Sequence, residues 1–115
     1  MMTYSHKEQL FPLGRILIAP ETESLGIDIP RLLRRHQSGD FGCVDQHDAD
    51  QNLKAIKSGE EIVSKYDVIV GEITIMICIM TEMALSYTVI FVLDKQNIKF
   101  LNDPEIGNHQ EPEGS

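Results

Sequence analysis

The sequence predicts one domain of the α+β class, with the element order β-α-α-α-β-β-β. Apolar residues recur at helical spacing between residues 28 and 58, whereas the segment after residue 61 contains strand-length apolar runs joined by short connections. Short connections indicate a C-terminal three-strand antiparallel meander. We therefore expect the helices to pack on one face of an antiparallel sheet. A chain of 115 residues holds one hydrophobic core.

The first elements are short. Residues 1–12 lack a periodic apolar pattern, so we expect a flexible extension ahead of a domain that spans residues 13–101. Residues 15–19 form an apolar run closed by Pro20, which predicts a buried strand. Residues 21–26 predict one helical turn that ends at a glycine.

The first of two longer helices is expected to begin after Asp28, which can accept a hydrogen bond from the first turn as an N-cap. Gly39 is placed to end it. Its apolar positions recur at helical spacing, so they share one face that should turn to the core. The residues of this face are Ile29, Leu32, Leu33 and His36.

The second longer helix is expected to begin after Asp45, with Asp48 in the position of the acid of a capping box. Gly59 is placed to end it. Its apolar residues again fall on one face, which we expect to be buried. The residues of this face are Ala49, Leu53 and Ile56.

Three strands are expected in residues 62–68, 73–80 and 87–93. The middle strand alternates isoleucines with threonine, cysteine and methionines, so both of its faces are apolar and both need cover. The helices can cover one face. For the other, the alternatives are a terminal segment, a partner protein, or a homodimer through the Met76 and Met80 face.

Composition and net charge limit the classes of function that the protein can have. The formal net charge is −8, which disfavours direct binding of nucleic acid. No apolar run is long enough to cross a membrane and no signal peptide is recognisable, so we expect a cytoplasmic protein. The segment 102–115 is polar and rich in Pro and Gly, which is typical of disorder; here it would form an acidic tail.

The segment 35–42, Arg-His-Gln-Ser-Gly-Asp-Phe-Gly, joins the two longer helices and holds the main candidate residues. His36 is either a half-buried structural histidine or a general acid or base, with Arg35 steadying a phosphate. Asp40 and Gly42 fit a tight turn better than catalysis, since Asp and Gly are common turn residues.

Metal and thiol chemistry find little support. The residue types of Asp45, His47, Asp48 and Asp50 suggest metal ligands. However, Leu53 stands where a calcium loop needs glycine and Gly59 where it needs glutamate. No zinc spacing is present. We expect no metal and no cofactor. The two cysteines, at positions 43 and 78, do not form a disulfide framework; a nucleophilic Cys43 would need a histidine close in space.

The chain resembles a family of small, mostly uncharacterised proteins of plasmids and other mobile elements, labelled plasmid-related proteins. The most specific match is the block from Arg35 to Gly42, which fits a pattern RHxxGD[WF]G. Softer matches are spread over residues 13–93. They are Leu13-Gly14-Arg15-Ile16, Pro20, Leu32, Leu33, Arg34, Asp45, Asp48, Asn52, Ala55, Gly59, Ser64, Tyr66, Gly71, Thr81, Glu82, Ser86 and Thr88.

The resemblance implies mobile-element biology and a cytoplasmic location. Two departures stand out. Met83-Ala84-Leu85 occupies a position where the family tends to Ala-Asp-Arg, and Cys43 replaces a usual acid. Any activity of the family that depends on that arginine would be absent from this chain.

Two functional hypotheses of different classes follow. The first is a non-enzymatic module that binds a host or mobile-element protein, with inhibition of a host defence system, anti-CRISPR or anti-restriction, as one such role. An acidic surface beside a basic helix end suits a protein partner, and an acidic surface can compete for a nucleic-acid groove. The candidate binding residues are Arg34, Arg35, His36, Asp40, Phe41, Asp45 and Asp48.

The second hypothesis is a metal-independent ribonuclease, because helices that carry an Arg-His pair before a meander look like ribonucleases of the barnase–colicin–RelE type. His36 would be the acid or base and Arg35 would stabilise the phosphate, with Tyr66 and Thr88 positioning it. The net charge of −8 weighs against RNA binding, so the binding module is preferred.

Overall fold

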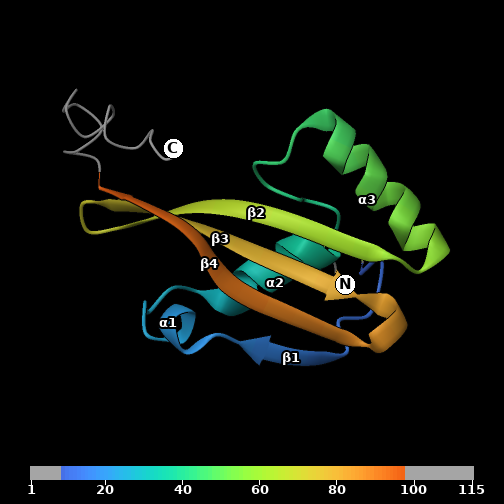
Figure 1. The fold of residues 1–115 in the computed structure, drawn as a ribbon, viewed down its shortest axis with the longest axis horizontal. Coiled ribbons are helices and arrows are strands. Elements are labelled where there is room, and N and C mark those ends of the chain that lie inside the picture. The colour runs from blue at the N-terminus through green and yellow to red at the C-terminus, as the bar shows by residue number, and fades with distance from the viewer. Residues whose placement is uncertain (1–8, 98–115) are drawn as a thin grey trace, which may run out of the picture.

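Four strands form the sheet in the computed structural model, which describes residues 9–97 (Figure 1). They are β1 (Arg15–Ile18), β2 (Glu61–Val70), β3 (Ile73–Glu82) and β4 (Tyr87–Asn97), in the spatial order β1-β4-β3-β2. The meander β2-β3-β4 is antiparallel, as expected, but β1 pairs with β4 in parallel. The α+β class is confirmed, and the sheet is mixed rather than antiparallel because the helices provide the long crossover that a parallel strand requires.

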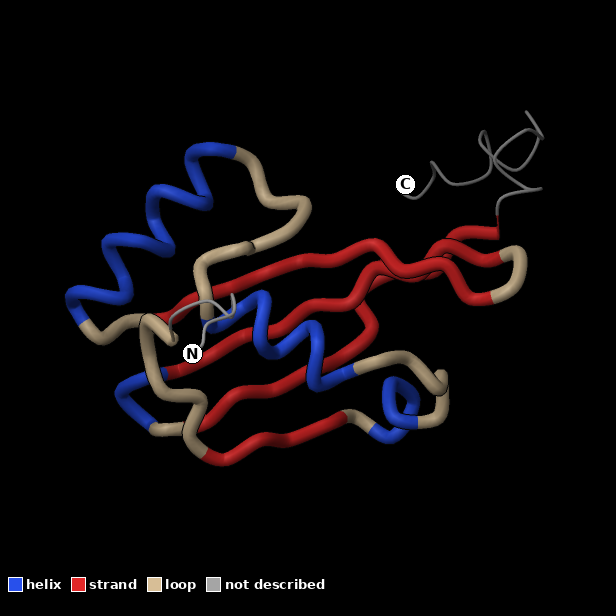
Figure 2. The backbone as a smooth tube through the Cα atoms, turned by 180° about the vertical axis from the view of Figure 1, so that it is seen from behind, coloured by secondary structure: helices blue, strands red, loops and turns tan. Residues whose placement is uncertain are grey.

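The helices are α1 (Pro20–Glu23), α2 (Ile29–Gln37) and α3 (Gln46–Ser58), and a short 3-10 turn, η1 (Met83–Leu85), joins β3 to β4. The prediction omitted η1. Only α2 lies across a sheet face: it is behind the strands in Figure 1 and in front of them in Figure 2, whereas α3 lies alongside the edge strand β2. The expectation that all helices stack on one face is therefore wrong for α3.

The main core lies between α2 and the sheet. The predicted apolar face of α2 is confirmed, because all of its members are buried. It packs against alternate residues of the strands, which point to one face because side chains alternate along a strand. The buried residues of this cluster are Ile29, Leu32, Leu33, Tyr66, Ile75, Ile77, Ile79 and Ile90.

Two predictions about the N-terminal part need correction. Strand β1 is an edge strand, and its first three residues are exposed rather than buried. Phe11, which the prediction placed in the flexible extension, is buried, and its carbonyl accepts a hydrogen bond from Nε2 of Gln37 at 2.7 Å. The folded unit therefore includes Phe11, whose ring meets the sheet end near α3.

Helix α3 is held by an asparagine. Leu53, expected in the core, is exposed, while Asn52 is buried. Its Nδ2 donates to the Val63 carbonyl at 2.8 Å and its Oδ1 accepts from the Val63 amide at 3.0 Å. The amide thus pairs with edge strand β2 as a neighbouring strand would, which satisfies exposed backbone groups that could otherwise recruit another chain.

The predicted tail 102–115 and most of the predicted extension lie outside the described residues. Among residues 9–97 no helix is long and apolar enough to cross a membrane.

Candidate functional site

A chain of hydrogen bonds runs through the core beneath the segment 35–42. The ring of His36 contacts Ser64 Oγ through Nδ1 at 2.6 Å and Thr81 Oγ1 through Nε2 at 2.8 Å. Thr81 Oγ1 contacts Thr88 Oγ1 at 2.7 Å, and Thr88 donates to the carbonyl of Leu13 at 2.7 Å. This series of hydrogen bonds connects α2, β2, β3, β4 and the segment that leads into β1.

The direction of each hydrogen bond in this chain follows from its last member. The Leu13 carbonyl can only accept, so the hydroxyl proton of Thr88 points to it. Thr88 must then accept from the hydroxyl of Thr81, and Thr81 must accept from Nε2–H of His36. Nδ1 is left for the contact with the Ser64 hydroxyl. The geometry therefore places a proton on Nε2, and in a neutral imidazole Nδ1 is then the acceptor.

Burial keeps this imidazole neutral. His36 is 0% exposed, and burial lowers its pKa to about 4. The ring also packs edge-on against Phe11, with 5.1 Å between centroids. A general acid or base must reach its substrate, and here both nitrogens are occupied by protein hydroxyls. In this arrangement, His36 and Thr88 contact other protein groups and hold the helix on the sheet.

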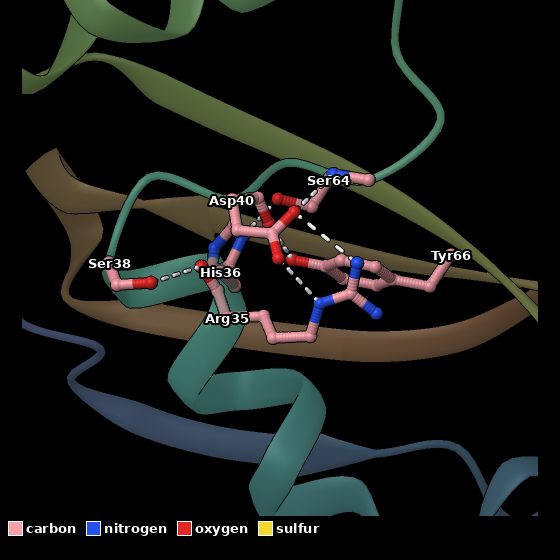
Figure 3. Close-up of polar contacts among 7 residues, drawn as sticks. Arg35, His36, Ser38, Asp40, Ser64 and Tyr66 are labelled. Carbon is pink, nitrogen blue, oxygen red and sulfur yellow. Dashed lines mark hydrogen bonds and ion pairs between the residues drawn. The ribbon is translucent and has the colours of Figure 1, made fainter. Parts of the chain in front are cut away.

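A second polar cluster lies at the surface end of the same segment (Figure 3). Arg35 donates from Nε to Asp40 Oδ2 at 2.7 Å and from Nη2 to Asp40 Oδ1 at 3.3 Å. Its guanidinium carbon lies 4.7 Å from the centroid of the Tyr66 ring. The hydrogen bond with Asp40 raises the pKa of Arg35, and burial raises the pKa of Tyr66, so Arg35 is charged and Tyr66 neutral at physiological pH.

The same cluster fixes the loop after α2. Tyr66 donates its hydroxyl to the Asp40 carbonyl at 2.6 Å, and Asp40 Oδ1 accepts from the Gly42 amide at 3.3 Å, as the predicted turn requires. Gly42 has φ +75°, and a Cβ there would collide with the carbonyl oxygen of Lys65. The loop therefore needs glycine at this position to lie directly against β2.

Charged groups flank this fixed loop, and we call residues 31–48 the helix joint. Arg31 and Arg34 are exposed on α2. Asp45 and Asp48 are exposed at the start of α3, where the carboxylate of Asp45 accepts from the Asp48 amide at 2.8 Å, which confirms the predicted cap. The joint therefore presents basic groups on one side of the loop and acidic groups on the other.

A shallow cleft of about 280 Å³ opens on the basic side. Arg31 and Arg35, one helical turn apart, line it with Asp28, and its apolar lining comes from Ile27, Leu32 and Val68. Arg35 is already bound to Asp40, so Arg31 is the guanidinium that can meet a carboxylate attached to an apolar segment here.

The remaining candidates separate in space. Phe41 is buried against α3 and cannot contact a partner directly. Cys43 is exposed, and its thiol contacts the Asp67 carboxylate at 3.5 Å rather than a histidine. No group of acids, cysteines and histidines among residues 9–97 is arranged to hold a metal ion.

The hypotheses from sequence gave no partners for His36 and no role for Asn52. Two signals were present. Ser64 interrupts an apolar strand face at a position that needs a buried partner. Asn52 lies inside a helix, where asparagine is unfavourable unless its amide bonds elsewhere. Neither signal names its partner, because Ser64 lies 28 residues from His36 and Asn52 lies 11 residues from Val63.

The fold and the site define an α+β domain with a buried histidine network beneath a charged joint. No family model, curated protein or solved structure matches the chain. The resemblance to the plasmid-related proteins therefore stays a prediction based on its motif residues.

Proposed function

We propose that this protein is a non-enzymatic module that binds another protein through the helix joint. The observation that carries the proposal is the Arg35–Asp40–Tyr66 cluster. It holds the loop between α2 and α3 in one conformation, by two hydrogen bonds from Arg35 and one from Tyr66. A loop that is ordered before binding loses less conformational entropy on binding, which favours affinity.

The charge pattern supports a protein as the partner. Arg31 and Arg34 fit acidic groups, and Asp45 and Asp48 fit basic groups, within one continuous segment. A nucleic acid would meet the acidic start of α3 and a net charge of −8. A folded protein can present both signs of charge and an apolar side chain for the cleft beside α2.

The partner class we propose is a host or mobile-element protein that itself binds nucleic acid, with defence nucleases and CRISPR effectors as the leading members. The acidity of the chain supports this class, since an acidic protein is attracted to basic grooves. The motif resemblance to plasmid-related proteins points to the same biology. The joint would supply orientation through Arg31 and Arg34, and the exposed acids would compete with phosphates.

Affinity purification from lysate of the organism that carries the gene tests the proposal, with bound proteins identified by mass spectrometry. The joint variant is Arg31→Glu with Arg34→Glu. The matched control is Lys54→Glu with Lys57→Glu on exposed positions of α3, which changes the net charge equally. We expect a protein that both wild type and control recover and that the joint variant loses. Recovery of the same proteins by all three, or of none, would overturn the proposal.

A further inference from the structure

The sheet face opposite α2 carries an ordered pattern of side chains, and we call it the outer face. Strand register divides it into rows, because residues paired across strands point to the same face. The apolar row consists of Leu17, Val89, Met80 and Val63. The neighbouring end row is charged and polar and consists of Arg15, Tyr87, Glu82 and Glu61.

No helix of the described chain lies over the outer face, which is turned toward the viewer in Figure 1. Leu17 on β1 is 43% exposed, and Met80, Val89 and Phe91 are only partly buried. A continuous apolar surface of this kind on a sheet marks an interaction site.

We propose that a second copy of this chain covers the outer face, related by a two-fold axis that runs parallel to the strands between β4 and β3. This axis places β1 opposite β2 of the partner copy and β4 opposite its β3, row against row. Arg15 then meets Glu61, and Tyr87 meets Glu82, each pair twice in the dimer. The apolar row meets itself, with Leu17 against Val63 and Val89 against Met80.

The order of the charges within the end row favours this two-fold axis over one that runs across the strands. Arg15 and Glu61 lie on opposite edges of the sheet, both are exposed, and neither forms an ion pair within residues 9–97. A two-fold axis across the strands would instead set the end row against a row that holds Asp67 and Asp94. Glu61 would then face Asp67, and like charges in contact disfavour association.

The remaining charges lie at the rim. Asp67 and Asp94 are exposed at the far end of the face, where water and salt screen their repulsion. Lys65 lies on edge strand β2 and can keep its ammonium in water. The face measures roughly 20 Å by 20 Å from strand spacing and rise, which is small for a permanent homodimer. We therefore expect a dimer with a dissociation constant in the micromolar range.

The outer face and the helix joint use different residues, so the dimer does not depend on the proposed function. Sedimentation of the full chain over a wide concentration range tests it. Wild type should pass from monomer to dimer, while Arg15→Glu and Glu61→Arg should each weaken the dimer about tenfold to a hundredfold, because two attractive pairs become repulsive. Circular dichroism checks that both variants fold.

Mixing the two single variants is the decisive measurement. In the mixed dimer, one contact joins the two substituted positions, which now carry opposite charges in exchanged places, and the other contact keeps the native Arg15 and Glu61. Both contacts are attractive, so the mixture should regain the affinity of wild type. The double variant Arg15→Glu with Glu61→Arg should also dimerise. Wild type that stays monomeric would overturn the proposal. So would the finding that another protein or residues 98–115 cover this face. A dimer whose dissociation constant is unchanged by both substitutions would overturn it too.

Discussion

Replacing His36 tests the network at the centre of the fold. His36→Ala removes two hydrogen bonds, leaves Ser64 and Thr81 without a partner for one hydrogen bond each, and opens a cavity beside Phe11. Each lost bond is worth about 1 kcal/mol and the cavity adds more, so the free energy of unfolding should fall by about 3–5 kcal/mol. His47→Ala, at an exposed position of α3, is the control and should change it by less than about 0.5 kcal/mol.

The same residue sets a pH dependence of stability. The pKa of His36 is about 4 in the folded state against 6.5 when unfolded, so the unfolded chain binds more protons between these values. Stability from this group is complete above pH 6.5 and is lost as the pH falls toward 4. The amount lost is about 3 kcal/mol.

Urea unfolding across this pH window, with wild type, His36→Gln and His47→Ala, measures the effect. Gln keeps one donor and one acceptor, which favours a folded variant. The difference between wild type and His36→Gln should shrink as the pH falls, while the His47→Ala difference should hardly change. The neutral buried histidine would be refuted if the difference in unfolding free energy between wild type and His36→Gln were independent of pH. It would also be refuted if NMR showed His36 titrating at or above its ordinary pKa.

Three further predictions follow from other positions. Gly42→Ala should cost several kcal/mol in thermal or urea unfolding, because its Cβ would collide with β2, whereas Gly71→Ala, which has positive φ but open space, should cost about 1 kcal/mol; equal losses would contradict the close approach. Asn52→Ala should speed exchange of the Val63 amide at the edge of β2, since it removes the Oδ1 acceptor of that amide, and unchanged exchange would refute the edge pairing. Iodoacetamide should label exposed Cys43 much faster than Cys78, where burial raises the thiol pKa, and equal rates would contradict that burial.

Local signals predicted the boundaries of the two longer helices well, whereas α1 ends at Glu23, before the predicted Gly26. Asp28 and Asp45 are the N-caps of α2 and α3, and Gly59 ends α3 in the left-handed conformation. These features depend on neighbours within a few residues, so sequence spacing is enough to identify them. The buried face of α2 followed for the same reason, because its apolar residues repeat with the helical period.

Features that depend on distant residues were harder to predict. The predicted face of α3 was wrong for Leu53, because the polar residue Asn52 turns inward to reach Val63 and no periodicity reveals such a partner. Its other two members, Ala49 and Ile56, do pack against the core. The strand β1 was assigned as buried because it is apolar, yet its place at the sheet edge is decided by where the crossover returns. For His36 the sequence left a structural and a catalytic role open, and its buried contacts with Ser64 and Thr81, which no spacing predicts, favour the structural role.

The buried hydrogen-bond chain also resolves an ambiguity in strand alignment. Strand β3 is apolar on both faces, so a slip of one residue would exchange isoleucines for methionines and still bury apolar surface. Such a slip would carry Thr81 away from both His36 and Thr88 and leave polar groups unpaired in the core. Hydrophobic burial therefore holds β3 in the sheet, while the threonines and the histidine select one register for it.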